Sequence, residues 1–226
     1  MKKHSIFRAA GLALASLLFM TPAQATLITL SGTSVNYTFD DSLLGLFGPA
    51  SVAGDTLFFT PTDFKVTAAG GTGAVSVTQS IDIEVSLKPG YKFVGLSLLE
   101  RGDYLLFGPG TNTADVGGML TITDSTHTLD IVLDSTDPLD VVGLPTQNWQ
   151  VAVADLAGWV PTLDLTLTNT LTASTDNARG IAFVEKKFAG ITVATVPEPG
   201  TLAIMLLGLG LLALGYRSRP ALAKTR

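Results

Sequence analysis

The chain has 226 residues, with 14 Lys and Arg, 19 Asp and Glu, two His and no Cys. The lack of Cys excludes disulfides, a lipid-modified Cys and thiol chemistry. The charge is unevenly spread, because residues 26–195 contain 18 acidic and 7 basic side chains, a net charge of −11. Nucleic acid and anionic lipid surfaces are therefore poor partners for this segment.

The N-terminus has the three parts of a secretory signal peptide. Basic residues precede an apolar run over residues 9–20, and Ala23 and Ala25 form a small-x-small cleavage site. This pattern predicts a signal peptide over residues 1–25, which belongs to export and not to the fold. The mature chain is then expected to begin at Thr26.

Two stretches of the middle segment alternate apolar and polar residues, with one break in each. Residues 75–87 are broken at Gln79, and residues 163–172 are broken at Asn169. A period of two places one face of a strand in a core and the other in water, as in antiparallel sheets. Weaker strand signals fall at Leu27–Leu30, Val35–Phe39, Thr56–Phe59, Phe93–Leu99, Tyr104–Phe107, Met119–Thr123, Leu129–Leu133, Trp149–Ala154 and Ile181–Val196. Short strands separated by Gly and Pro turns predict a mainly β ectodomain over residues 26–195, an antiparallel β-sandwich with a jelly-roll-like topology.

The C-terminus holds a second apolar segment. Residues 202–216 carry no charge and contain three Gly, and Arg217 and Arg219 follow in a basic end. The run is shorter than the roughly 20 residues that usually span a bilayer. Its glycines would each destabilise a water-exposed helix by about 1 kcal/mol, but membrane helices tolerate them. We predict a transmembrane helix with a cytoplasmic C-terminus; the alternative is a buried core helix.

The order of motifs over residues 196–226 points to a family. Val-Pro-Glu-Pro-Gly at 196–200, then the apolar helix, then the Arg-rich end, resembles the PEP-CTERM sorting signal of Gram-negative bacteria. The resemblance implies processing by an exosortase, a membrane protease that cuts near the motif. It also implies that Pro197, Glu198, Pro199 and Gly200 form a recognition site and not a catalytic one. Proteins with this signal are typically surface or matrix proteins of strains that make exopolysaccharide.

Catalytic and metal-binding residues are scarce in the ectodomain. His127 is its only His, and no G-x-S-x-G motif accompanies it, so a structural or surface role is expected. Asp130, Asp134, Asp137 and Asp140 could supply oxygen ligands to Ca²⁺, but they lack the spacing of a calcium loop. A solvated loop is the preferred interpretation. No cofactor or metal is expected, with Ca²⁺ kept as the alternative.

Two other sets of residues are candidates for a function that involves carbohydrate. Glu100 and Asp103 could form the carboxylate pair of a glycosidase, although Gly102 between them favours a hairpin turn. Trp149 lies among apolar residues and is expected in the core. Trp159 is the better candidate for an exposed glycan contact, because Gly and Pro flank it in a predicted loop.

The sequence as a whole predicts an exported protein without enzymatic activity. An inner-membrane-tethered precursor would be processed by an exosortase, and the mature form would lie on the cell surface or in the extracellular matrix. Its role would be structural or adhesive, with exopolysaccharide as a candidate partner. The alternative is a secreted carbohydrate-active hydrolase on the same β-sandwich scaffold.

Overall fold

The computed structural model describes residues 26–156 and 161–198, together with Gly200, Ile204, 207–209 and 211–212. Several sequence predictions fall outside these residues: those for Ala23, Ala25, Trp159, Pro199, Arg217 and Arg219. Within the described part of the chain, no helix combines the length and the apolar character that a membrane crossing requires.

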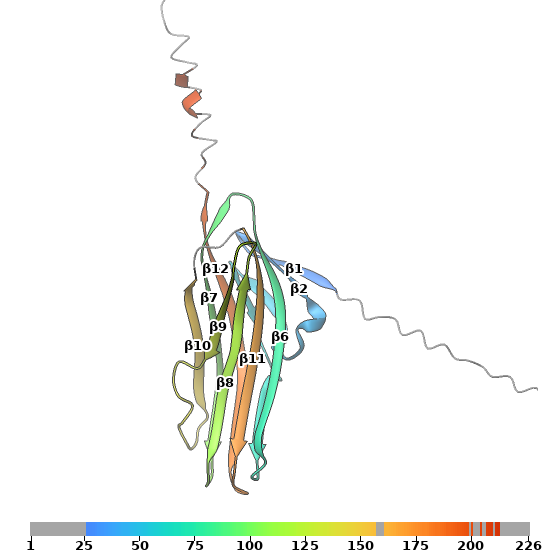
Figure 1. Ribbon diagram of the computed structural model, residues 1–226, viewed down its shortest axis with the longest axis vertical. Helices are drawn as coiled ribbons and strands as arrows, with labels where there is room; N and C mark the ends of the chain where they lie inside the picture. The colour runs from blue at the N-terminus through green and yellow to red at the C-terminus, as the bar shows by residue number, and fades with distance from the viewer. Residues whose placement is uncertain are drawn as a thin grey trace, which may run out of the picture.

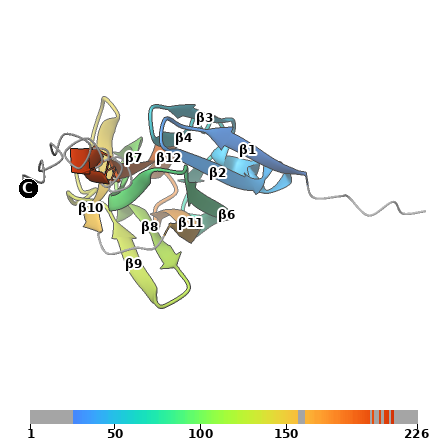
Figure 2. The ribbon, with the colours of Figure 1, turned by 90° about the horizontal axis from the view of Figure 1, so that it is seen from above.

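The described chain folds into two antiparallel sheets that face each other. The first sheet has the order β1 (Leu27–Ser31), β2 (Val35–Asp40), β6 (Gly73–Leu87), β11 (Thr162–Thr175), β8 (Asn112–Thr123), β9 (Thr128–Asp134). The second has the order β10 (Gln147–Leu156), β7 (Tyr91–Phe107), β12 (Ile181–Pro197), β4 (Thr56–Phe59), β3 (Ala50–Ala53), and β5 (Lys65–Ala69) also pairs with β12. Two short 3-10 turns, η1 (Asp41–Leu43) and η2 (Gly45–Phe47), follow β2. Figure 1 shows the long strands running side by side, and Figure 2 shows β6, β11 and β8 in one layer and β7, β12 and β4 in the other. The predicted β-sandwich is thus confirmed, while the jelly-roll likeness stays a prediction.

The alternating pattern of the sequence explains how the layers pack. In β11 the inward positions from Leu163 to Ala173 are buried in the core between the sheets. The outward positions of β11 and β6 carry hydroxyl groups that meet across the strands, as in the pairs Thr78–Thr170 and Ser80–Thr168 at 2.8 and 2.7 Å. Such cross-strand pairs stabilise a sheet on its solvent side. The aromatic part of the core includes Tyr37, Phe39, Phe47, Phe59, Phe64 and Trp149.

The structure corrects one prediction about β7. The sequence predicted two strands joined by a hairpin turn at Gly102, but β7 runs without interruption from Tyr91 to Phe107. Gly102 is needed for a close approach and not for a turn. A Cβ atom there would lie 1.8 Å from the Glu185 carbonyl oxygen and 2.6 Å from the Trp149 ring. Position 102 therefore requires glycine, because the Glu185 carbonyl and the Trp149 ring fill the space that a side chain would need.

Two short strands, β3 and β5, were not predicted from the sequence. Both lie in the second sheet, where β3 pairs with β4 and β5 pairs with the first part of β12. β4 pairs with a later part of β12, so β4 and β5 share one side of that strand. The chain between them carries Phe64 into the core, and its carbonyl accepts a hydrogen bond from the Lys186 amide at 2.8 Å.

Candidate functional site

The sorting motif begins inside the second sheet. Val196 and Pro197 are the last residues of β12 and pair with Lys92 and Tyr91 of β7. The amide of Glu198 donates a hydrogen bond of 2.8 Å to the Gly90 carbonyl, in the turn between β6 and β7. Figure 1 shows this end of β12 at the tip of the sandwich, beside the β6–β7 hairpin. The described part of the motif thus leaves the sheet directly from a central strand.

A small surface pocket lies next to Glu198. It has a volume of about 240 Å³ and is lined by Leu87, Tyr91, Lys92, Phe93, Pro161 and Glu198. Because the lining combines two aromatic residues, a cation and the motif carboxylate, the surroundings of the motif are mixed apolar and charged. Any enzyme that reads the motif close to the sheet meets these side chains as well.

The core contains a cluster of three polar side chains. Glu100, Asn169 and Lys186 are each no more than 1% exposed. Lys186 Nζ lies 2.7 Å from Glu100 Oε2, and Asn169 Nδ2 donates to the same oxygen at 3.3 Å. Among the described residues, Glu100 Oε1 and Asn169 Oδ1 have no hydrogen-bond partner, and Lys186 Nζ meets Glu100 as an ion pair without the geometry of a hydrogen bond. A buried polar atom without a partner is destabilising, so this cluster requires an explanation.

Three strands from both sheets bring the cluster together. Glu100 comes from β7 and Lys186 from β12 in the second sheet, and Asn169 comes from β11 in the first. The pairing of β12 with β7 shifts register between Lys186 and Phe188. This bulge changes which residues of β12 face inward, since bulges re-aim side chains. Lys186 is the last inward residue before the shift.

Aromatic rings enclose the amine of Lys186. Nζ lies 5.5 Å from the ring centroid of Phe64 and 5.7 Å from that of Trp149. Trp149 is only 4% exposed, as predicted for a core residue, and its Nε1 donates to the Glu185 carbonyl at 3.0 Å. Burial lowers the pKa of Lys186, and the nearby charge of Glu100 offsets part of that effect. The lowered pKa increases the share of the neutral amine.

The structure separates the two carboxylates that the sequence placed side by side. Glu100 faces the core, whereas Asp103 lies on the outer face of β7 and contacts Lys187. Residues an odd number apart on a strand point to opposite faces. Glu100 and Asp103 thus do not form the carboxylate pair of a glycosidase, and this hypothesis for the pair is wrong.

An open pocket of about 610 Å³ lies on the outer face of the second sheet. Its polar lining includes Arg101, Asp103, Asn148, Gln150 and Lys187. Lys187 Nζ also lies 3.0 Å from Glu185 Oε1. The pocket offers several donors and acceptors in a shallow, solvent-facing arrangement.

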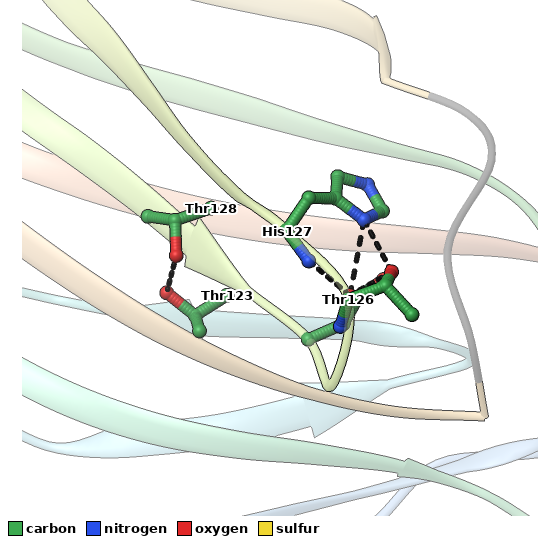
Figure 3. A network of polar contacts seen from close by, with 5 residues as sticks. Thr123, Thr126, His127 and Thr128 are labelled. Atoms are coloured by element: carbon green, nitrogen blue, oxygen red, sulfur yellow. Dashed lines mark hydrogen bonds and ion pairs between the residues drawn. The ribbon is translucent and has the colours of Figure 1, made fainter.

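His127 lies in the turn between β8 and β9 (Figure 3). Its Nδ1 is 2.6 Å from Thr126 Oγ1 and 3.1 Å from Asp124 Oδ1. Asp124 Oδ1 also accepts hydrogen bonds from the amides of Thr126 and His127. Desolvation raises the pKa of Asp124, but the hydrogen bonds from the Thr126 hydroxyl and from the two amides outweigh it and hold the pKa at about 2. His127 thus lies in a hydrogen-bonded surface turn, and its structural or surface role stays a prediction.

The Asp residues considered for Ca²⁺ do not converge. Thr121 Oγ1 donates to Asp130 at 2.7 Å, and the Ser135 amide donates to Asp134 at 2.7 Å. Asp137 and Asp140 lie in the exposed segment after β9. Among the described residues, no three His, Asp or Glu side chains are grouped so that they could hold a metal ion.

Comparison with known proteins assigns the C-terminal part of the chain. The family model of the PEP-CTERM protein-sorting motif matches residues 195–219. The chain therefore carries this motif, which indicates an exported protein sorted by an exosortase-type enzyme. No curated protein matches the chain.

Two solved structures resemble the chain at a low level. One is titled "Structure of infectious bursal disease virus Gx strain", with 11% identity and a TM-score of 0.31, covering 66% of this chain and 41% of that one. The other is titled "Structure of infectious bursal disease virus Gt strain", with 13% identity and a TM-score of 0.19, covering 69% of this chain and 47% of that one. The chain thus spans less than half the length of either viral chain.

The sequence draws attention to two residues of the buried cluster but does not show that they meet in the core. Asn169 breaks the alternation of β11, and Glu100 stands out as a candidate carboxylate. Lys186 was missed, because the run Glu185-Lys186-Lys187 reads as exposed. The available signal was the break itself, since a polar residue at an inward position must find a polar partner across the core.

Proposed function

We propose that this protein is a structural or adhesive component of the cell surface or extracellular matrix, delivered there by its sorting motif. The observation that carries the proposal is the motif at residues 195–219, continuous with the central strand β12 of an otherwise well-packed sandwich. In this proposal a precursor is tethered in the inner membrane by an apolar C-terminal helix. An exosortase-type enzyme then releases the ectodomain near Pro197.

The proposed ectodomain has no enzymatic activity, cofactor or bound metal. Its candidate partner is exopolysaccharide. The open pocket with Arg101, Asp103 and Asn148 supports this partner, because sugars are recognised by many polar contacts on shallow surfaces. Trp159 stays a proposed glycan contact. A carbohydrate-active hydrolase has less support, since the one carboxylate pair considered for it is divided between two faces of β7.

The test of sorting is a double substitution, Pro197→Ala with Pro199→Ala, expressed in the native host. We expect an uncut form that stays in the membrane fraction, because the recognition site is lost. Pro138→Ala, in an exposed loop, is the matched control and should be processed normally. Release of the double variant at the wild-type size would contradict the proposal.

A further inference from the structure

The buried cluster of Glu100, Asn169 and Lys186 holds the components of an amide-forming reaction. It contains an amine, a carboxamide and a carboxyl group, all within the core between the sheets. A single oxygen, Glu100 Oε2, contacts both the Lys186 amine at 2.7 Å and the Asn169 amide nitrogen at 3.3 Å. This oxygen therefore contacts both the nitrogen that would form the new amide bond and the nitrogen that would leave.

As a simple ion pair, this arrangement is unfavourable. Burying two charges carries a large desolvation penalty, which is offset only when the remaining polar atoms are also satisfied. Here Glu100 Oε1 and Asn169 Oδ1 have no partner among the described residues. A well-packed apolar core would be at least as stable, so stability alone does not account for the three groups.

We propose that Lys186 and Asn169 form a spontaneous isopeptide bond that joins the two sheets, with Glu100 as the acid–base group. The bond links β11 of the first sheet to β12 of the second. It is an autocatalytic modification and requires no other protein. It is independent of the sorting motif and of the proposed surface role.

The reaction balances without an oxidant or a co-reactant. The neutral Lys186 Nζ attacks Asn169 Cγ, so the Nζ–Cγ bond forms and the Cγ–Nδ2 bond breaks. Glu100 first takes the proton that makes the Lys186 ammonium neutral. It then delivers a proton to Nδ2, which leaves as ammonia, and recovers a proton from Nζ. The product is a secondary amide, and one ammonia molecule is lost.

The surroundings favour each step. Burial lowers the pKa of Lys186, which increases the share of the nucleophilic, neutral amine. The carboxyl group already contacts both nitrogens, so the proton has a short path, as general acid–base catalysis requires. Phe64 and Trp149 cover the amine. They exclude water that would compete with the amine or hydrolyse the product.

The product also removes the unfavourable feature of the cluster. The ammonium becomes a neutral amide, and Glu100 can then stay protonated and donate a hydrogen bond. The buried charges disappear, while the three side chains keep their positions. In a chain without Cys, this bond would provide a covalent link between the sheets.

The test is a tryptic peptide map of the purified full chain after denaturation. Asn169 falls in the peptide 102–179 and Lys186 in the peptide 180–187, because no Lys or Arg lies between positions 101 and 179. We expect these two peptides as one cross-linked species, lighter than their sum by one ammonia, with no cleavage after Lys186. Separate peptides, with trypsin cutting after Lys186, would overturn the proposal and leave a buried ion pair only.

Variants then assign the roles. Asn169→Ala and Glu100→Gln should each give separate peptides, whereas Asn148→Ala, an exposed Asn in the same peptide, should keep the cross-link. A Glu100→Gln protein with wild-type circular dichroism and an intact cross-link would overturn the role of Glu100. The wild-type map decides whether the bond exists, even if a variant fails to fold.

Discussion

Lys186 and Lys187 are neighbours in sequence, and each lies against a carboxylate of β7, yet their environments are opposite. Lys186 is buried against Glu100, and burial lowers its pKa. Lys187 has a side chain that is 52% exposed, and its hydrogen bonds with Asp103 and Glu185 raise its pKa. The same pair of residue types thus gives a potential nucleophile on one face of the sheet and an ordinary surface ion pair on the other.

The difference shows that the face of the strand, and not the residue types, sets the chemistry. Two successive lysines on a strand must point to opposite sides. The bulge after Lys186 then lets Ala189 and Ile191 resume the inward positions. A strand without this bulge would not place Lys186 inward together with those two residues.

The largest effect should come from removing the buried acid. Glu100→Ala leaves the Lys186 amine in the core without its carboxylate and without the acid–base group of the proposed bond, so the amine stays buried and unpaired. The free energy of unfolding should fall by about 3–5 kcal/mol. Asp103→Ala, on the outer face of the same strand, should change it by about 0–1 kcal/mol. Urea unfolding of both variants measures the contrast. Equal losses would mean that the two faces do not differ as described.

A smaller effect should follow from disturbing the cover over Lys186. In Gly102→Ala the new methyl group would lie 1.8 Å from the Glu185 carbonyl and 2.6 Å from the Trp149 ring. We expect a loss of about 1–3 kcal/mol, as for other overpacked sites, with a change in Trp fluorescence. The matched control is Gly95→Ala on the same strand, where the nearest atom is 3.9 Å away. A Gly102→Ala protein as stable as the Gly95→Ala control would refute the close-approach argument.

The smallest effect should come from Lys187→Met. Because its pKa is raised in the folded state, Lys187 contributes stability that is full below the ordinary pKa of a lysine and is lost as pH rises through the raised value. The difference from wild type should be about 0–1 kcal/mol at neutral pH and should shrink at about 1 M salt, where screening is strong. Denaturation at low and high salt measures this. A difference that salt leaves unchanged would show a packing effect instead.

The sequence predicted the class of fold well because the alternation is a local property. Residues 163–172 and 75–87 show their inward and outward faces directly, and both stretches lie in long strands. The breaks at Gln79 and Asn169 did not interrupt either strand. All nine weaker strand signals also lie within strands, although most of these strands extend beyond the predicted ends.

The features that the sequence did not predict depend on contacts between distant strands. The sequence does not distinguish a glycine that permits a turn from a glycine that permits a close approach between strands. The prediction of a turn at Gly102 was wrong for this reason. Lys186 is buried next to a bulge and against Glu100, which Asn169 of the opposite sheet also contacts, and the local pattern shows none of these contacts. The sorting motif, in contrast, is a linear signal and could be recognised from its residues alone.

The continuity of the sorting motif with β12 also determines how this molecule would bear tension. A pull on the C-terminal end enters through Pro197, and β12 lies between β7 on one side and β4 and β5 on the other. Because β7 pairs with β12 from Ile181 to Pro197, a load along the strand acts on many hydrogen bonds together in shear, instead of opening them one at a time. An anchor on this strand would therefore transmit force into the most extensively paired part of the sandwich.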